Sequence, residues 1–141
     1  MTTDRLRGPD TDTDTDTVAA LLRRNLLDVF GEPDPERRAA AIAATYSDDV
    51  VWHEAGRQVI RGREALARRA AELRAQAPDW VFSPDGPVSV NDDLGHLGFR
   101  FGPPGQPPVV TGMDIAHCRD GVIVELYTFV TEAPGGAAVQ Q

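Results

Sequence analysis

The stretch "DDVVWHEAGRQVIRG", residues 48–62, opens like a β-strand, with apolar side chains at Val50 and Trp52. His53 and Glu54 then stand where further apolar residues would be expected. Side chains alternate between the two faces of a strand, so Glu54 shares a face with Val50 and Trp52. The carboxylate therefore points either to water or into a cavity, where it would be a candidate general base.

Around this stretch, the spacing of apolar residues predicts three helices and a set of antiparallel strands. The expected helices cover residues 17–31, 34–46 and 62–78, and the later strands cover 80–90, with a turn inside, 94–102, 109–118 and 122–131. Asp16 or Thr17 is expected to cap the first helix, and Asp34 the second. Two helices, one short strand, a helix and three or four strands predict an α+β fold, in which a curved sheet buries one face against the helices.

The length of 141 residues suffices for one domain, which we expect over residues 15–132. The repeat "TDTDTDT" at 11–17 cannot bury apolar surface, so residues 1–14 are expected to form a disordered acidic and threonine-rich tail. Residues 133–141 are expected to form a flexible C-terminal tail.

The composition narrows the classes of partner and chemistry. A net charge of −8 with no basic stripe argues against nucleic acid and membranes as partners. All 14 positively charged side chains are arginine, which excludes a lysine Schiff base, and Cys118 is the single cysteine, which excludes an internal disulfide. The three histidines have spacings that match no metal-ligand motif, so neither a metal nor another cofactor is expected. No signal peptide or spanning run is apparent, which predicts a cytoplasmic protein.

Asp114 lies between Met113 and Ile115 in a strongly strand-like run, although aspartate is depleted in strands. Alternation places it on the same face as Gly112 and Ala116. An aspartate buried under helices cannot remain an isolated anion. We expect that it either finds a partner or has a raised pKa and stays protonated, in which case it can donate a hydrogen bond to an oxyanion.

With "YSDDVVWHEAG", "IRGREAL" and "TGMDIAHCRDGVIVELYTFV" in this order, the chain resembles the nuclear transport factor 2-like superfamily, which includes SnoaL-like cyclases and ketosteroid isomerases. The resemblance covers residues 17–132. It implies a cone in which three helices cap a curved, mostly antiparallel sheet around a deep apolar pocket, and dimerisation through the outer face of the sheet. The expected partners are a hydrophobic small molecule and a second copy of the chain.

The ketosteroid isomerase pattern, carried over to this sequence, implies a base at Glu54 and an acid at Asp114, in the strand before the last hairpin. The family's tyrosine donor on the first helix is missing; Arg24 and Asn25 are the nearest positions, and Asn25 could donate a hydrogen bond instead. The candidate pocket lining consists of Trp52, Phe99, Leu126 and Thr128. The implied function is cofactor-free acid–base catalysis on a hydrophobic, carbonyl-bearing molecule, with isomerisation or aldol-type cyclisation as the outcome.

Two alternatives stay open. Glu54 could be a surface charge paired with Arg57 or Arg61, and Asp114 could cap a turn or pair with an arginine, which would leave a non-catalytic small-molecule-binding domain. An epoxide hydrolase or epoxide-opening cyclase would instead need an arginine beside the acids, and Arg100 is the nearest candidate.

Overall fold

The computed structural model describes residues 14–134, so most of the two expected tails, residues 1–13 and 135–141, lies outside the described residues. The helices are α1 (Thr15–Arg24), which continues as the π-helix η2 (Asn25–Phe30), α2 (Pro35–Thr45) and α3 (Arg63–Gln76). The strands are β1 (Tyr46–Glu54), β2 (Gln58–Arg61), β3 (Val81–Asn91), β4 (Leu94–Gly102), β5 (Val110–Arg119) and β6 (Val122–Glu132).

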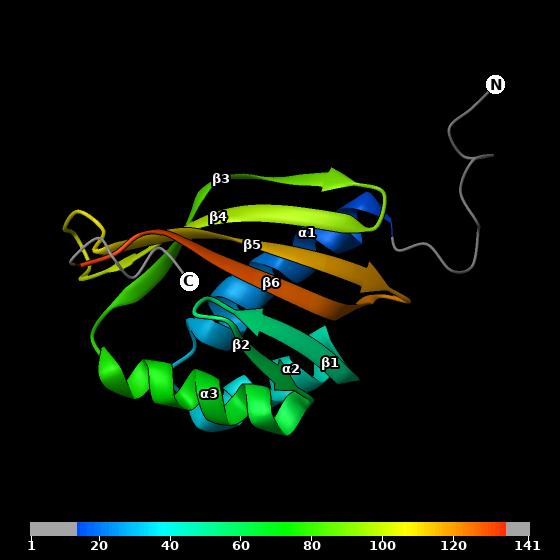
Figure 1. Ribbon diagram of the computed structural model, residues 1–141, viewed down its shortest axis with the longest axis horizontal. Helices are drawn as coiled ribbons and strands as arrows, with labels where there is room; N and C mark the ends of the chain where they lie inside the picture. Colours follow the sequence, from blue (N-terminus) through cyan, green and yellow to red (C-terminus); the bar gives the residue numbers. More distant parts are fainter. Residues whose placement is uncertain (1–13, 135–141) are drawn as a thin grey trace.

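All six strands form one sheet in the order β2-β1-β6-β5-β4-β3. β1 and β6 pair in parallel, and every other neighbouring pair is antiparallel. Figure 1 shows α1 running behind the sheet, while α2 and α3 lie together below the edge that carries β1 and β2. The predicted α+β fold, with helices on one face of a curved and mostly antiparallel sheet, is confirmed. No helix within residues 14–134 is long and apolar enough to cross a membrane.

Three local expectations were wrong. Helix α1 begins earlier than expected, because the side chain of Asp14, and not that of Asp16 or Thr17, caps it by accepting the Thr17 N–H at 2.8 Å. Strand β2 was missed, and the run expected to contain a turn is a single strand, β3. A register shift between Asp85 and Ser89 takes the place of that turn. The expected caps of α2, Asp34 with Pro35 at the first helical position, are confirmed.

The first helix changes from α-helical to π-helical geometry at Asn25, one of the predicted site residues. It is α-helical up to Arg24 and π-helical from Asn25 to Phe30, where the spacing had predicted a continuous α-helix. Asn25 is fully buried, and so are Leu22 and Leu26, its neighbours on the apolar face of the helix. π-helical turns are rare and occur frequently at functional sites.

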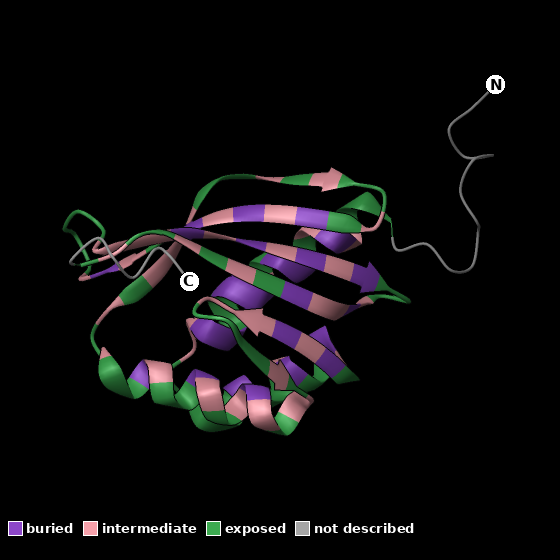
Figure 2. Ribbon diagram, viewed as in Figure 1, coloured by how far each residue is buried: buried purple, intermediate pink, exposed green. Residues whose placement is uncertain are grey.

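The core lies between the helices and the concave face of the sheet. Figure 2 shows buried and less buried residues alternating along the strands, as a sheet with one covered face requires. On β5 the buried face holds Gly112, Asp114, Ala116 and Cys118, as the alternation predicted. On β4, a side chain at Gly95 would collide with α1, because a Cβ there would lie 2.7 Å from a methyl group of Leu22.

Arg63, in the stretch "RGREAL", connects the start of α3 to the stretch "DDVVW" and to the residues just before it. Its guanidinium donates to the backbone carbonyls of Ala43 and Tyr46, where α2 turns into β1, and it pairs with Asp48. The Asp48 side chain is 90% exposed, so the ion pair itself adds little. The contacts to the carbonyls bind the start of α3 to the α2–β1 junction.

We expect Arg63→Met to lower the free energy of unfolding by about 1–3 kcal/mol, because it leaves carbonyl groups at the α2–β1 junction without donors. Asp48→Asn should change it by less than about 0.5 kcal/mol, since an exposed ion pair is weak. Urea unfolding of both variants, with Arg61→Met on exposed β2 as a matched control, measures the two effects. An Asp48→Asn loss as large as that of Arg63→Met would show that the ion pair, and not the contacts to the carbonyls, stabilises the junction.

Candidate active site

A cavity of about 370 Å³ opens between the concave face of the sheet, η2 and the end of α3. Its lining consists of Leu26, Phe30, Trp52, Glu54, Ala55, Leu73, Gln76, Ala77, Trp80, Phe82, Phe99, Phe101, Val110, Asp114, Thr128 and Val130. Both predicted acids line it, and so do Trp52, Phe99 and Thr128. Leu126 is fully buried outside the lining, and Asn25 reaches the site only through Asp114.

Aromatic rings form two walls of this cavity. On one side Phe30 packs against Trp52, with ring centroids 4.9 Å apart. On the other side Phe82 stacks on Phe101 at 4.1 Å, and Trp80 meets the edge of Phe101 at 5.2 Å. Walls of this kind favour a flat, apolar ligand.

Asp114 is 5% exposed and accepts a hydrogen bond at each carboxyl oxygen. The Thr128 hydroxyl donates to Oδ1 at 2.7 Å, and Nδ2 of Asn25 donates to Oδ2 at 3.0 Å. Thr128 Oγ1 also accepts the Trp52 Nε1 hydrogen at 3.0 Å, which leaves its own hydroxyl hydrogen for Asp114. While Thr128 and Asn25 both donate, a proton carried by Asp114 uses a lone pair that neither neighbour occupies.

Tyr46 completes this buried chain of hydrogen bonds. Its hydroxyl donates to Oδ1 of Asn25 at 2.5 Å, which leaves the amide nitrogen of Asn25 to face Asp114. Tyr46 is fully buried, and nothing in the sequence indicated the role of its hydroxyl. Burial and the nearby Asp114 charge raise the pKa of Tyr46 well above its usual value, so it stays a neutral donor.

Burial raises the pKa of Asp114 from its ordinary 3.8 to about 6, although the hydrogen bonds from Thr128 and Asn25 act in the opposite direction. Of the two expected outcomes, Asp114 shows parts of both: it has hydrogen-bonding partners, and its pKa is raised, but only to about 6. No arginine within residues 14–134 hydrogen-bonds this carboxyl, so a structural ion pair does not explain its position.

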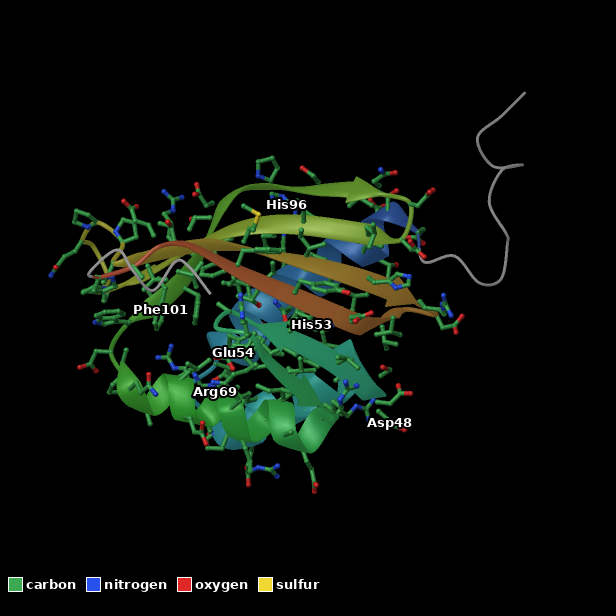
Figure 3. The ribbon with its side chains drawn as sticks, viewed as in Figure 1. Asp48, His53, Glu54, Arg69, His96 and Phe101 are labelled. Carbon is green, nitrogen blue, oxygen red and sulfur yellow. The ribbon has the colours of Figure 1, made fainter. Side chains whose placement is uncertain are left out.

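Glu54 is held differently. Its side chain is 9% exposed and forms an ion pair with Arg69 of α3, with Nη2 2.8 Å from Oε2. Figure 3 shows the two side chains meeting between the end of β1 and α3. The expected partners Arg57 and Arg61 were wrong, because the helix that covers this end of the sheet supplies the cation. The signal for Arg69 was its place at helical spacing from Leu66 and Leu73, on the edge of the apolar stripe.

The sheet register brings the two acids to the same row of the concave face. Asp114 pairs with Thr128 across β5 and β6, and His53 of β1 pairs with Tyr127, so Glu54 lies next to Thr128. Neighbouring strands lie about 4.8 Å apart, which places the two acidic residues roughly 10 Å apart along the row. Side chains converging over that span can contact two neighbouring atoms of one small ligand.

The other charged groups lie elsewhere. Arg100, the arginine considered for an epoxide hydrolase, is exposed and donates to the carbonyl of Pro84, away from both acids. His53 pairs with Glu125 at 2.6 Å on the outer face of the sheet. Within residues 14–134, no three histidine, cysteine or acidic side chains gather as a metal site would require.

The SnoaL-like domain profile matches residues 13–126, most of the chain. The chain belongs to the SnoaL-like family. A provisionally named isomerase of this family from Agrobacterium tumefaciens is similar in structure, with a TM-score of 0.75 and 17% identity, over 82% of this chain and 98% of that one. The comparison with curated protein sequences gives no significant match.

Two further solved structures share this SnoaL-like fold. A provisionally named SnoaL-like polyketide cyclase from Jannaschia has a TM-score of 0.66 and 18% identity, over 88% of this chain and 89% of that one. A provisionally named ketosteroid isomerase from Kribbella flavida has a TM-score of 0.65 and 20% identity, over 92% of this chain and 91% of that one. Identities this low show a common fold and leave the chemistry to the residues of the site.

We expect Asp114→Asn to stabilise the protein, and to do so more at high pH. A folded-state pKa raised from 3.8 to about 6 means that folding is penalised as the pH rises through this window. The full penalty above the window is about 3 kcal/mol, and it falls by about 2 kcal/mol on acidification to about pH 4. Thermal and urea unfolding across this pH range, with exposed Asp49→Asn as the control, measures the gain. A gain that is absent, or that grows on acidification, would contradict a penalised carboxylate.

Proposed function

We propose that the cavity is the active site of an acid–base enzyme that acts on a hydrophobic, carbonyl-bearing small molecule without needing a cofactor. The observation that carries this proposal is that two carboxyls with opposite environments open into one otherwise largely apolar cavity. Pairs of acids treated differently by their surroundings are typical of sites that need a base and a proton donor together.

Glu54 is the proposed base. Its carboxylate is paired with the Arg69 guanidinium, and a carboxylate positioned on the cavity wall can accept a proton. Its place at the end of β1 puts it on the cavity wall beside Trp52 and Ala55. A substrate carbon packed against the aromatic walls would lie within its reach.

Asp114 is the proposed hydrogen-bond donor. A ligand that displaces water from the cavity desolvates this carboxyl further, and desolvation favours its protonated form. Because Thr128 and Asn25 both donate to Asp114, the proton of the neutral acid is directed to the cavity that Asp114 lines. Such a donor stabilises the negative charge that develops on a carbonyl oxygen.

The proposed reaction begins when Glu54 removes a proton from the carbon next to the carbonyl. The electron pair moves onto the carbonyl oxygen, where Asp114 stabilises the enolate. Where a carbon–carbon double bond is conjugated with the enolate, return of the proton from Glu54 to the far end of that bond shifts the double bond and gives isomerisation. Where the enolate carbon instead attacks a second carbonyl, a carbon–carbon bond forms, the π bond of that carbonyl breaks, and its oxygen takes the proton from Glu54, which gives aldol-type cyclisation. Structural neighbours named as isomerases and polyketide cyclases support this choice of reactions.

A non-catalytic binding domain would use the same cavity and is the second candidate. The ion pair between Glu54 and Arg69 is compatible with it, since such a pair can join α3 to β1 without taking part in any reaction. The two candidates differ in one measurable property, because only an enzyme of the proposed kind labilises protons next to a carbonyl. An epoxide-opening reaction is less well supported, because Arg69 hydrogen-bonds Glu54 and not Asp114.

The outer face of the sheet is the proposed contact between two copies of the chain. Phe129 and Tyr127 are 49% and 36% exposed there, and they neighbour Met113 and Ile115 in the register. Val59 is 48% exposed on the same face and pairs with His53, whose ring stacks on Tyr127 at 4.3 Å.

If the outer face joins two copies, Phe129→Asp should convert a dimer to a monomer, because it places an uncompensated charge in a buried interface. Light scattering after size exclusion gives the mass of each form. Val81→Asp, on β3 at the sheet edge, is the matched control, since Val81 is similarly exposed at 47%. A parent protein that is already monomeric would refute this contact.

For the reaction itself, we expect the protein to catalyse deuterium uptake by 2-tetralone in heavy water. This neutral, flat ketone serves as a general probe, and nuclear magnetic resonance follows loss of the protons between its carbonyl and its aromatic ring. Glu54→Gln should slow the catalysed exchange roughly 100-fold or more, because an amide cannot accept the proton. Exposed Glu64→Gln on α3 is the matched control.

The pH profile separates the two acids. Because Asp114 acts in its protonated form, exchange by the free enzyme should fall as the pH rises above about 6. Asp114→Asn retains an N–H donor, so it should keep most of the activity and lose this decline. Loss of activity in Asp114→Asn but not in Glu54→Gln would reverse the assigned roles. If the parent protein catalyses no exchange, the proposed enzyme is wrong and the non-catalytic binding domain is the supported candidate.

A further inference from the structure

Arg69 contacts Glu54 through a three-bond arrangement that fixes both the charge and the direction of the carboxylate. Nε of Arg69 lies 2.9 Å from Oε1 and 3.0 Å from Oε2, and Nη2 lies 2.8 Å from Oε2. The two residues come from different elements, β1 and α3, and neither the family profile nor the solved neighbours assign Arg69 a role. Sequence reasoning missed it as well.

The two oxygens of Glu54 are not equivalent in this arrangement. Oε2 accepts from two nitrogens of the guanidinium, whereas Oε1 shares a single N–H with Oε2. A carboxylate has about four acceptor positions, so Oε1 keeps the larger share of free lone pairs. Glu54 lines the cavity and Arg69 does not, so the oxygen that Arg69 occupies least is the one available to a ligand.

Arg69 is itself held in place from the solvent side. Its Nη1 donates to Oε1 of Glu72 at 3.1 Å, one turn further along α3. The Glu72 side chain is 62% exposed and the Arg69 side chain 24%, so this second contact lies at the surface. The guanidinium is thus attached at both ends, and its orientation relative to Glu54 does not depend on one flexible side chain.

We propose that Arg69 is a positioning residue, whose fork-shaped guanidinium holds Glu54 so that Oε1 faces the substrate as the proton-accepting atom. This inference rests on the proposed function. It requires the planar two-nitrogen geometry of arginine as well as its charge, because a lysine ammonium in the same place is a point charge that cannot fix both oxygens. Since Arg69 lies outside the cavity lining, it should act on turnover and not on binding of the ligand.

The competing interpretation is that Arg69 is only a structural link between α3 and β1. A buried ion pair broken on one side destabilises a protein strongly, so loss of stability alone does not distinguish the two interpretations. The distinguishing measurements are the catalytic constant at a saturating probe concentration, the Michaelis constant, and the turnover retained by the conservative Arg69→Lys variant.

The experiment compares Arg69→Lys and Arg69→Met with the parent in deuterium exchange of 2-tetralone, with Arg68→Lys and Arg68→Met on the exposed neighbouring position as matched controls. We expect Arg69→Lys to fold, to keep the Michaelis constant within about twofold and to lose about tenfold in the catalytic constant. Arg69→Met should lose more, because it removes both the fork geometry and the charge beside Glu54.

The outcomes are distinct from those that test the proposed function. If Glu54→Gln abolishes exchange but Arg69→Lys matches the parent in turnover, the proposed function stands and the positioning role of Arg69 is wrong. If both Arg69 variants lose stability and retain full turnover while folded, Arg69 is only a structural link. Should Arg69→Met fail to fold, Arg69→Lys alone decides between these outcomes.

Discussion

The buried carboxyl of Asp114 is the constraint on which the rest of the site depends. An acid on the concave face of a sheet loses its water, and its charged form is penalised. Asn25 and Thr128 offset part of that penalty by donating hydrogen bonds, and each is held in turn by a second donor, Tyr46 or Trp52. An apolar residue at position 114 would fill the same place without any of these partners, so packing alone does not require an acid there.

The need for hydrogen-bond donors to Asp114 is also visible in the secondary structure. Asn25 lies on the apolar face of the first helix, where a leucine would otherwise pack, and the helix turns from α to π at that residue. Tyr46 ends α2 and begins β1, so the same junction that Arg63 stabilises also delivers the hydroxyl that orients Asn25. The helices, the sheet and the polar network are therefore parts of one packing solution.

Features that depend on residues close together in the sequence were predictable, and features that depend on contacts between distant residues were not. The fold and Asp114 were predictable, because period, capping residues and an acid inside an apolar strand are local signals. Strand β2 was missed because "QVIR" is short and forms only by pairing with β1. The partner of Glu54 was sought among arginines close in sequence, but α3 crosses the end of β1 and brings Arg69 there. Such contacts depend on which side of a helix faces the sheet and on how the sheet curves. Neither can be predicted from the pattern of neighbouring residues in the sequence.

The contrast between the two acids indicates what the cavity selects for. Glu54 is paired with a cation that lies outside the cavity lining, whereas Asp114 accepts hydrogen bonds from two neutral donors. No unpaired cation lines the cavity within residues 14–134, so a ligand with a free carboxylate or phosphate would meet acids and aromatic rings without a partner. A neutral ligand with a carbonyl oxygen does not need a cation for binding. Its negative charge would form only during the reaction, on the oxygen that Asp114 would contact. The groups that would stabilise an enolate thus also disfavour a ligand that carries a negative charge.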